Sequence, residues 1–164
     1  MDFWGSQAVS RLFGGAIPPK EFGGLLEYIL YPFQLRLLAD QGRFRAWESA
    51  RQIGKSFTLG VDAVLAAASA PKRHQTFFAA SERQSLELLD KARAHVSVFE
   101  QVFKRKMAKR STATLIELVN GSKIRALPAN GRTARGVSGD IYLDEFAHVQ
   151  GDKAFWTAVL PIIT

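Results

Sequence analysis

Two helices are expected in the first half of the chain. Apolar residues recur every third or fourth position between residues 57 and 65, which predicts a helix over residues 55–70 that ends before Pro71. A shorter helix is expected over residues 32–40, with a proline in its first turn.

A longer helix is expected in the middle of the chain. Gln84 follows Ser81 by three positions, and this spacing is a capping box, in which each residue satisfies a backbone N–H near the other. The helix that it opens is expected to continue over residues 85–110. A further helix is expected from about Asp152 to the end of the sequence.

Other segments alternate apolar and polar residues with a period of two, which is typical of strands. Asn120-Gly121 separates two of them and is a strong hairpin signal. Strands that alternate with helices predict an α/β fold with a largely parallel sheet and flanking helices. The expected strands are "RFRAWES" (43–49), "HQTFFAA" (74–80), "TLIELVN" (114–120), "KIRALPA" (123–129) and "IYLDE" (141–145).

The remaining pattern and the composition fit one domain with an arm. Residues 1–24 contain paired glycines and prolines and are expected to form an irregular N-terminal arm, whereas residues 25–164 form the domain. The length of 164 residues and the hydrophobic content of 47% fit a single globular core.

The charge and the missing residue types narrow the class of protein. A net charge of +7 and a pI near 10.0 favour a polyanionic partner. The absence of cysteine excludes disulfides and thiolate metal sites. No apolar run approaches the roughly 18 residues that span a bilayer, and no signal peptide is recognisable. We therefore expect a soluble intracellular protein without a membrane partner.

The stretch "SARQIGKS", Ser49 to Ser56, has the ending of a phosphate-binding loop. In such loops backbone N–H groups surround the phosphates, the lysine contacts phosphate oxygens, and the following hydroxyl binds Mg²⁺. Lys55 and Ser56 supply these groups after Gly54, although Ser49 replaces the usual first glycine. A surface turn is the alternative, but the position between a predicted strand and a predicted helix favours a nucleotide site.

A pair of acids follows the last predicted strand, in "DIYLDEFA". Ligands of parallel α/β sheets bind at the carboxyl ends of strands, so Asp144 and Glu145 are expected to face the loop around Lys55. Asp144 would bind Mg²⁺ and Glu145 would activate a water. An acidic pair that merely opens the next helix is the alternative.

Gln34, in "YPFQ", lies one predicted helix and one predicted strand before the loop. Its amide could contact an adenine edge while Tyr31 or Phe33 packs on the ring. The alternative is a polar residue on an amphipathic helix.

Together, "YPFQLRLL", "SARQIGKS", "TARGVSGDIYLDEFAHV" and "AFWTAVLPIIT" resemble the ATPase domain of the large terminase subunit, the DNA-packaging motor of tailed bacteriophages. The resemblance covers the chain from about Leu30 onward. It implies a P-loop NTPase of the additional-strand, catalytic-glutamate type. Arg51-Gln52 is its most specific part, because terminases commonly carry an arginine there and tolerate a small residue such as Ser49.

The resemblance also implies roles for individual residues. Gln34 becomes the adenine contact, Arg51 a phosphate-sensing arginine and Glu145 the catalytic base. Arg135 could reach the nucleotide of a neighbouring subunit, or else be an ordinary loop arginine. The ATP-binding loop would comprise Ser49, Ala50, Arg51, Gln52, Ile53, Gly54, Lys55 and Ser56, and Mg²⁺ would be held by Ser56 and Asp144.

Partners and completeness follow from the same resemblance. It implies double-stranded DNA, a homo-oligomeric ring on a portal, a small terminase subunit and the cytoplasm of a bacterial host. It also implies a further strand between the acidic strand and the strand before the loop, so the domain is expected to lack C-terminal strands. Alternatives are a superfamily 2-like helicase and a truncated remnant that binds nucleotide without turnover.

One basic run has two interpretations. Lys104, Arg105, Lys106, Lys109 and Arg110 could contact DNA phosphates. Basic residues also stabilise the last turns of a helix, and by sequence alone this second interpretation is favoured.

Overall fold

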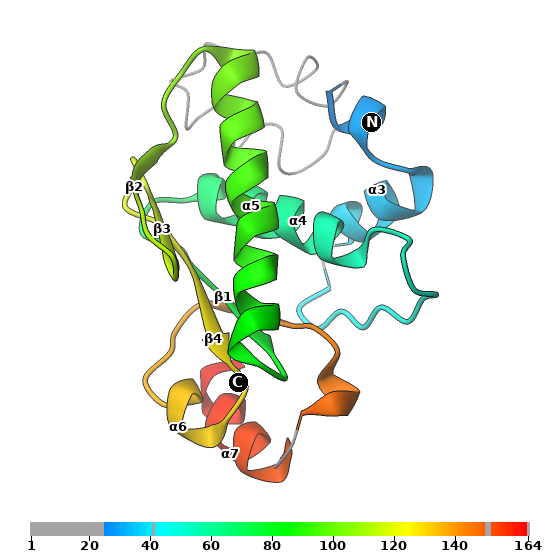
Figure 1. Cartoon of the computed structure of the whole chain (residues 1–164), viewed down its shortest axis with the longest axis vertical. Coiled ribbons are helices and arrows are strands. Elements are labelled where there is room, and N and C mark those ends of the chain that lie inside the picture. The colour runs from blue at the N-terminus through cyan, green and yellow to red at the C-terminus, as the bar shows by residue number, and fades with distance from the viewer. Residues whose placement is uncertain (1–24, 41, 150–151, 164) are drawn as a thin grey trace.

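A five-stranded sheet of order β2-β3-β4-β1-β5 forms the centre of the molecule (Figure 1). The computed structural model describes residues 25–40, 42–149 and 152–163, so the expected arm over residues 1–24 lies outside the described residues. The strands are β1 (His74–Ala79), β2 (Ala108–Ser111), β3 (Leu115–Leu118), β4 (Lys123–Pro128) and β5 (Asp140–Leu143).

The sheet is mixed, whereas the sequence predicted a largely parallel one. β1 pairs in parallel with β4 and with β5, but β3 is antiparallel to both β2 and β4. The reason is the short connections, since the expected hairpin at Asn120-Gly121 joins β3 to β4 and only three residues join β2 to β3.

The expected helices are present on both sides of the sheet. Ser81 and Gln84 form the predicted capping box. No helix within the described ranges has the length and apolar character required to cross a membrane. The helices are α3 (Pro32–Ala39), α4 (Lys55–Ser69), α5 (Glu82–Phe103), α6 (Gly131–Ala134), the 3₁₀ turn η1 (Phe146–His148) and α7 (Asp152–Ile163).

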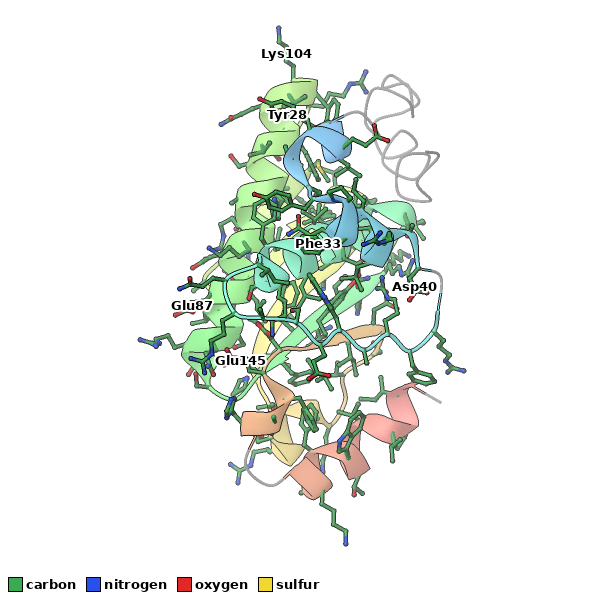
Figure 2. The ribbon with its side chains drawn as sticks, turned by 90° about the vertical axis from the view of Figure 1, so that its right-hand side faces the viewer. Tyr28, Phe33, Asp40, Glu87, Lys104 and Glu145 are labelled. Atoms are coloured by element: carbon green, nitrogen blue, oxygen red, sulfur yellow. The ribbon has the colours of Figure 1, made fainter. Side chains whose placement is uncertain are left out.

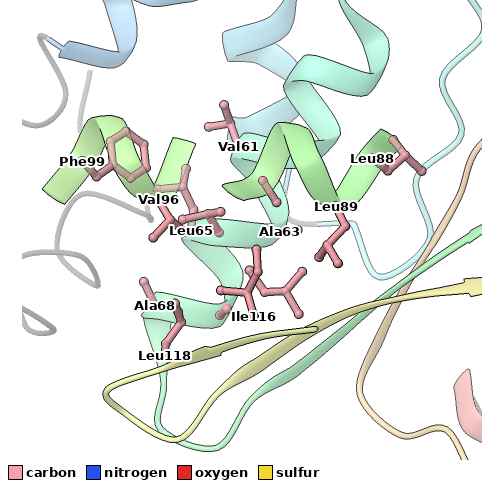
Figure 3. Packing of buried hydrophobic residues seen from close by; sticks show 14 of the residues in the cluster. Val61, Ala63, Leu65, Ala68, Leu88, Leu89, Val96, Phe99, Ile116 and Leu118 are labelled. Atoms are coloured by element: carbon pink, nitrogen blue, oxygen red, sulfur yellow. The ribbon is translucent and has the colours of Figure 1, made fainter. Parts of the chain in front are cut away.

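Two hydrophobic clusters lie on opposite faces of the sheet because successive strand residues point in opposite directions. Phe77 of β1 joins the cluster under α4 and α5, part of which Figure 3 shows, and Phe78 joins the cluster that α7 covers. Helices α4 and α5 approach closely at Gly60, where a Cβ would lie 3.1 Å from the backbone nitrogen of Ala92. The larger cluster thus fixes α4, which begins at the candidate phosphate loop.

The predicted helix over residues 85–110 is too long. Helix α5 ends at Phe103, Lys104 takes a left-handed conformation with φ of 50°, and residues 108–111 form β2 instead. Met107 is completely buried, so burial of its side chain competes successfully with continuation of the helix. Tertiary packing overrides local helix propensity here.

The predicted strand over residues 43–49 is absent. Residues 45–50 have no regular secondary structure, and within the described part of the chain no strand pairs with the outer edge of β5. Alternation of side chains is insufficient for a strand because its backbone groups also need a partner strand. The chain over residues 43–49 instead leads to the loop before α4 without joining the sheet.

Candidate active site

The candidate phosphate loop, residues 49–56, contains two left-handed backbone positions. Gly54 caps α4 with φ of 83°, and Gln52 also has a positive φ of 62°. The left-handed backbone angle of Gly54 favours glycine, and a Cβ there would lie 2.7 Å from the side-chain nitrogen Nε2 of Gln34, which would have to shift. Lys55 and Ser56 therefore begin a helix, where the N–H groups and the positive end of the helix dipole attract anions.

Ser56 and Asp144 meet although 88 positions separate them. The hydroxyl of Ser56 donates a hydrogen bond to Oδ2 of Asp144 at 3.1 Å. Asp144 directly follows β5, and its backbone N–H donates to the carbonyl of Phe78. Of the two acids expected to face the loop, Asp144 contacts a loop residue, whereas the carboxylate of Glu145 pairs with α5.

The carboxylate of Glu145 contacts the first turn of α5. Its backbone N–H donates to Oδ1 of Asp144 at 3.0 Å, and its Oε2 accepts a hydrogen bond from Nε2 of Gln84 at 2.8 Å. Glu145 has φ of 49°, a left-handed conformation that is uncommon outside glycine. The two adjacent carboxylates therefore have different partners, Ser56 for Asp144 and Gln84 for Glu145.

Gln84 is a site residue that sequence reasoning recognised only as part of a cap. Its Oε1 accepts from the backbone N–H of Ser81 at 3.2 Å, so its NH₂ group is left to donate to Glu145. The signal that could have suggested this role is that a capping box fixes the direction of its glutamine side chain.

A cavity of about 140 Å³ lies between the loop, β5 and α5. Gln84, Glu87 and Lys91 of α5 line it together with Ser56, Asp144 and Glu145. Within the described residues no group of three or more His, Cys, Asp or Glu could hold a metal ion. The cavity is therefore polar but contains no complete metal cage of protein groups.

The oxygens of Ser56 and Asp144 nevertheless fit Mg²⁺. Two adjacent ligands of an octahedral Mg²⁺ lie about 2.9–3.0 Å apart, given Mg–O distances near 2.0–2.1 Å, and the separation here is 3.1 Å. Mg²⁺ commonly takes one or two protein ligands and fills the rest with water and phosphate oxygens. This pair matches that requirement.

A second hollow, of about 510 Å³, lies on the other side of Gly54. Tyr31 and Phe33 stack on each other along its wall with centroids 5.7 Å apart, and Ile53 and Phe57 add apolar surface. Figure 2 labels one residue of each hollow: Glu145, after β5, lines the first, and Phe33, on α3, lines the second.

Gln34 lies at the wall of this second hollow, but its amide is already engaged. Oε1 accepts from the N–H of Tyr31 at 2.8 Å, and Nε2 donates to the carbonyl of Ile53 at 3.3 Å. Only 3% of the residue is exposed. In this structure Gln34 ties α3 to the phosphate loop.

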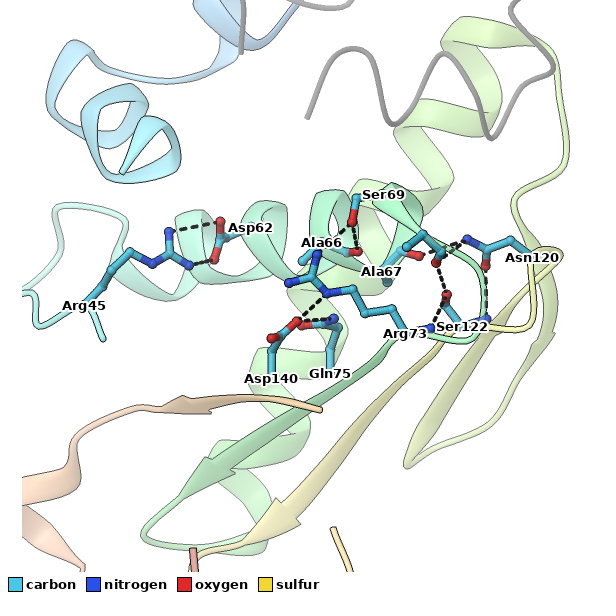
Figure 4. A network of polar contacts seen from close by, with 11 residues as sticks. Arg45, Asp62, Ala66, Ala67, Ser69, Arg73, Gln75, Asn120, Ser122 and Asp140 are labelled. Atoms are coloured by element: carbon cyan, nitrogen blue, oxygen red, sulfur yellow. Dashed lines mark hydrogen bonds and ion pairs between the residues drawn. The ribbon is translucent and has the colours of Figure 1, made fainter. Parts of the chain in front are cut away.

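Polar contacts link the segment before the loop to α4, and Figure 4 shows them together with those around Arg73. Arg45, in the segment before the loop, makes an ion pair of 2.5 Å with Asp62 of α4, whose side chain is 2% exposed. Tyr142 of β5 hydrogen-bonds to Asp62, and burial, followed by the nearby Asp62 and Asp140 carboxylates, raises the pKa of Tyr142 well above its usual value. Tyr142 is thus a protonated donor that links β5 to α4.

The family comparison matches this part of the chain. The model of the family described as terminase large subunit, T4likevirus-type, N-terminal, matches residues 48–164, which contain the loop, the acidic strand and every strand of the sheet. The chain belongs to this terminase family. No curated protein matches the chain.

Membership of the terminase large-subunit family indicates a role in packaging phage DNA, with DNA and the packaging machinery as partners.

Two arginines to which the terminase resemblance gave roles make none of the contacts described above. Arg51 is exposed in the loop. Arg135 is exposed after α6, on the segment that leads to β5, and no described residue forms an ion pair with it.

Proposed function

We propose that this chain is a P-loop ATPase that hydrolyses ATP with Mg²⁺ to drive double-stranded DNA into a phage procapsid. The observation that carries the proposal is the contact between Ser56 and Asp144. It joins the end of a phosphate loop to a carboxylate at the end of a strand, which is the pairing that Mg-dependent phosphoryl transfer requires.

The loop residues would bind the phosphates of the nucleotide. The N–H groups at the start of α4 and the ammonium of Lys55 supply positive charge, and no carboxylate among the described residues pairs with Lys55 in competition. The remaining loop residues, from Ser49 to Ile53, would surround the phosphates, with Arg51 as the sensor. Ser49 Oγ is buried without a hydrogen-bond partner.

Ser56 and Asp144 would hold Mg²⁺, which when bound neutralises charge on the phosphate oxygens. Glu145 would orient the attacking water and accept its proton. The hydrogen bond from Gln84 holds the carboxylate of Glu145 in one direction. The second hollow, with Tyr31 and Phe33 on its wall, would take the adenine.

Assembly with other copies would complete the motor. We propose a homo-oligomeric ring on the portal, working with a small terminase subunit in the host cytoplasm. Arg135 is exposed and would reach the nucleotide of the next subunit, where a cation stabilises the charge of the transition state.

The test is binding of a fluorescent ATP analogue with Mg²⁺ to the full chain. Lys55→Ala removes a charge-assisted phosphate contact and should weaken binding by about 1.5–3 kcal/mol, or about 10- to 150-fold. Lys72→Ala removes an exposed lysine at the other end of α4 and should leave affinity unchanged. Equal affinity of wild type and Lys55→Ala would show that the loop is not the nucleotide site.

A further inference from the structure

The segment between α5 and β3 displays a concentration of positive charge. Lys104, Arg105, Lys106, Lys109 and Arg110 are all exposed, and no acidic residue occurs between them. We call residues 104–110 the basic segment. In Figure 2 Lys104 projects from one end of the molecule, far from Glu145.

Stabilisation of a helix end explains only part of this charge, at the C-cap Lys104 and the adjacent Arg105. Helix α5 ends at Phe103 and its last turn contains no basic residue. Lys106 lies beyond the cap, and Lys109 and Arg110 belong to β2, so they lie outside the turn in which the helix dipole favours cations.

Backbone hydrogen bonds hold the middle of the basic segment, at Met107 and Ala108. One carboxylate oxygen of Glu100 accepts hydrogen bonds from the N–H groups of Met107 and Ala108, at 2.7 and 2.8 Å. The carbonyl of Met107 accepts from Val119 of the neighbouring hairpin at 2.8 Å, and its side chain is buried in the core. A ligand would therefore pay little conformational entropy to order this backbone.

Neighbouring acids leave most of the charge uncompensated. Glu100 turns its carboxylate toward the backbone, as described above. Glu117 pairs with Lys109 at 3.1 Å, and this hydrogen bond is the main reason that the pKa of Glu117 is lowered. Lys104 and Lys106 have no carboxylate partner among the described residues, and Arg110 lies opposite Glu117 in the β2–β3 register but forms no ion pair with it.

We propose that the basic segment binds the phosphate backbone of double-stranded DNA. The inference builds on the DNA-packaging role, and it assigns the contact to a specific surface. A duplex carries regularly spaced phosphates, which complement several cations displayed on one short segment. Helix α5 has 22 residues and is therefore about 33 Å long, so this surface is separate from the Gln84–Glu145 contact at the other end of the helix.

The experiment measures affinity for a fluorescent duplex over a range of salt concentrations. The test variant is Lys104→Gln/Lys106→Gln/Arg110→Gln. The control, Arg36→Gln/Lys72→Gln/Arg132→Gln, removes three exposed cations elsewhere. Each variant lowers the net charge from +7 by three, to +4.

The test variant should bind at least about tenfold more weakly near 0.1 M salt, and its slope of log K against log salt should fall by up to about 2.7. The control should retain most of the wild-type slope. Equal weakening of both variants, no effect of the test variant, or absence of duplex binding by the wild type would overturn the proposal. Stronger competition by a polyglutamate peptide than by unlabelled duplex would also overturn it and indicate a protein partner.

Binding of the MgATP analogue separates this proposal from the ATPase proposal. The test variant should keep wild-type nucleotide affinity because its three cations lie far from Lys55. A chain that binds duplex through the basic segment but does not bind nucleotide would contradict only the ATPase proposal.

Discussion

Asp144 and Glu145 are adjacent in the sequence but have different partners. Asp144 accepts from Ser56 at the start of α4, and Glu145 accepts from Gln84 of α5. Two carboxylates held in different directions can take different chemical roles, one as a metal ligand and one as a base. The sequence predicted both residues, but it contained no information on which of them meets Gln84.

The role of Glu145 can be tested with an amide of the same size. In Glu145→Gln the new Oε1 can still accept from Gln84, so local structure should be retained while the base is lost. We expect MgATP affinity to be unchanged and phosphate release to fall by about 10²–10⁴-fold. Phosphate release with and without duplex DNA provides the measurement, with Glu87→Gln, on the same cavity wall, as the control. Comparable turnover by Glu145→Gln would move the base to another residue, with Asp144 the next candidate.

At the scale of elements, the segment before the loop is positioned by an ion pair instead of by sheet pairing. Arg45 also donates to the carbonyl of Leu37 at 3.1 Å, so one guanidinium contacts both α3's last turn and Asp62 of α4. Both oxygens of the Asp62 carboxylate accept hydrogen bonds from Arg45, Oδ1 from Nη1 at 3.4 Å and Oδ2 from Nη2 at 2.5 Å. This bidentate geometry fixes direction as well as distance.

Removing Arg45 should destabilise the protein. Arg45→Met leaves the carboxylate of Asp62 buried with Tyr142 as its remaining partner, and loss of one member of a buried pair costs about 3 kcal/mol. Arg73→Met breaks the half-exposed pair with Asp140, in which the side chains are 38% and 39% exposed, and should cost about 1 kcal/mol or less. Urea denaturation measures both changes.

The double variant Arg45→Met/Asp62→Leu provides the internal control. Replacing both charges with apolar side chains removes the unpaired carboxylate, so much of the stability lost in Arg45→Met should return. Equal destabilisation by Arg45→Met and Arg73→Met would show that the buried pair has no special structural role.

For the whole molecule, one buried histidine links stability to pH. His95 of α5 is 4% exposed, its Nε2 lies 3.0 Å from the carbonyl of Phe57 in α4, and its ring meets that of Phe57 edge to face. Burial is the main cause that lowers the pKa of His95, and the nearby Lys91 acts in the same direction. The neutral imidazole therefore belongs to the packed interface between α4 and α5.

Stability should consequently fall as the pH falls below about 6.5. The unfolded chain binds a proton at the ordinary histidine pKa, whereas folded His95 binds it only at lower pH, so protons favour the unfolded state. Urea denaturation between about pH 7.5 and pH 5 should show a smaller slope for His95→Gln than for the wild type. His148→Gln, at an exposed position, is the control, and an unchanged slope in His95→Gln would contradict this account.

Local sequence signals determined most of the individual elements. The capping box at Ser81 and Gln84, the apolar spacing of α4 and the Asn120-Gly121 hairpin each depend on residues within a few positions of one another, so they can be recognised without the fold. The loop residues Gly54–Ser56 and the acids Asp144 and Glu145 were recognisable for the same reason, because their chemistry requires fixed neighbours.

Tertiary structure decided the features that depend on distant residues. Helix α5 ends at Phe103 because Met107 packs in the core and Glu100 binds the backbone beyond the helix. Residues 43–49 alternate apolar and polar side chains as a strand does, yet no described strand pairs with their backbone, so they remain outside the sheet. Contacts across the chain, such as Gln84 with Glu145 and Arg45 with Asp62, arise only when separate elements are packed together, since short-range patterns carry no information on which distant side chains meet.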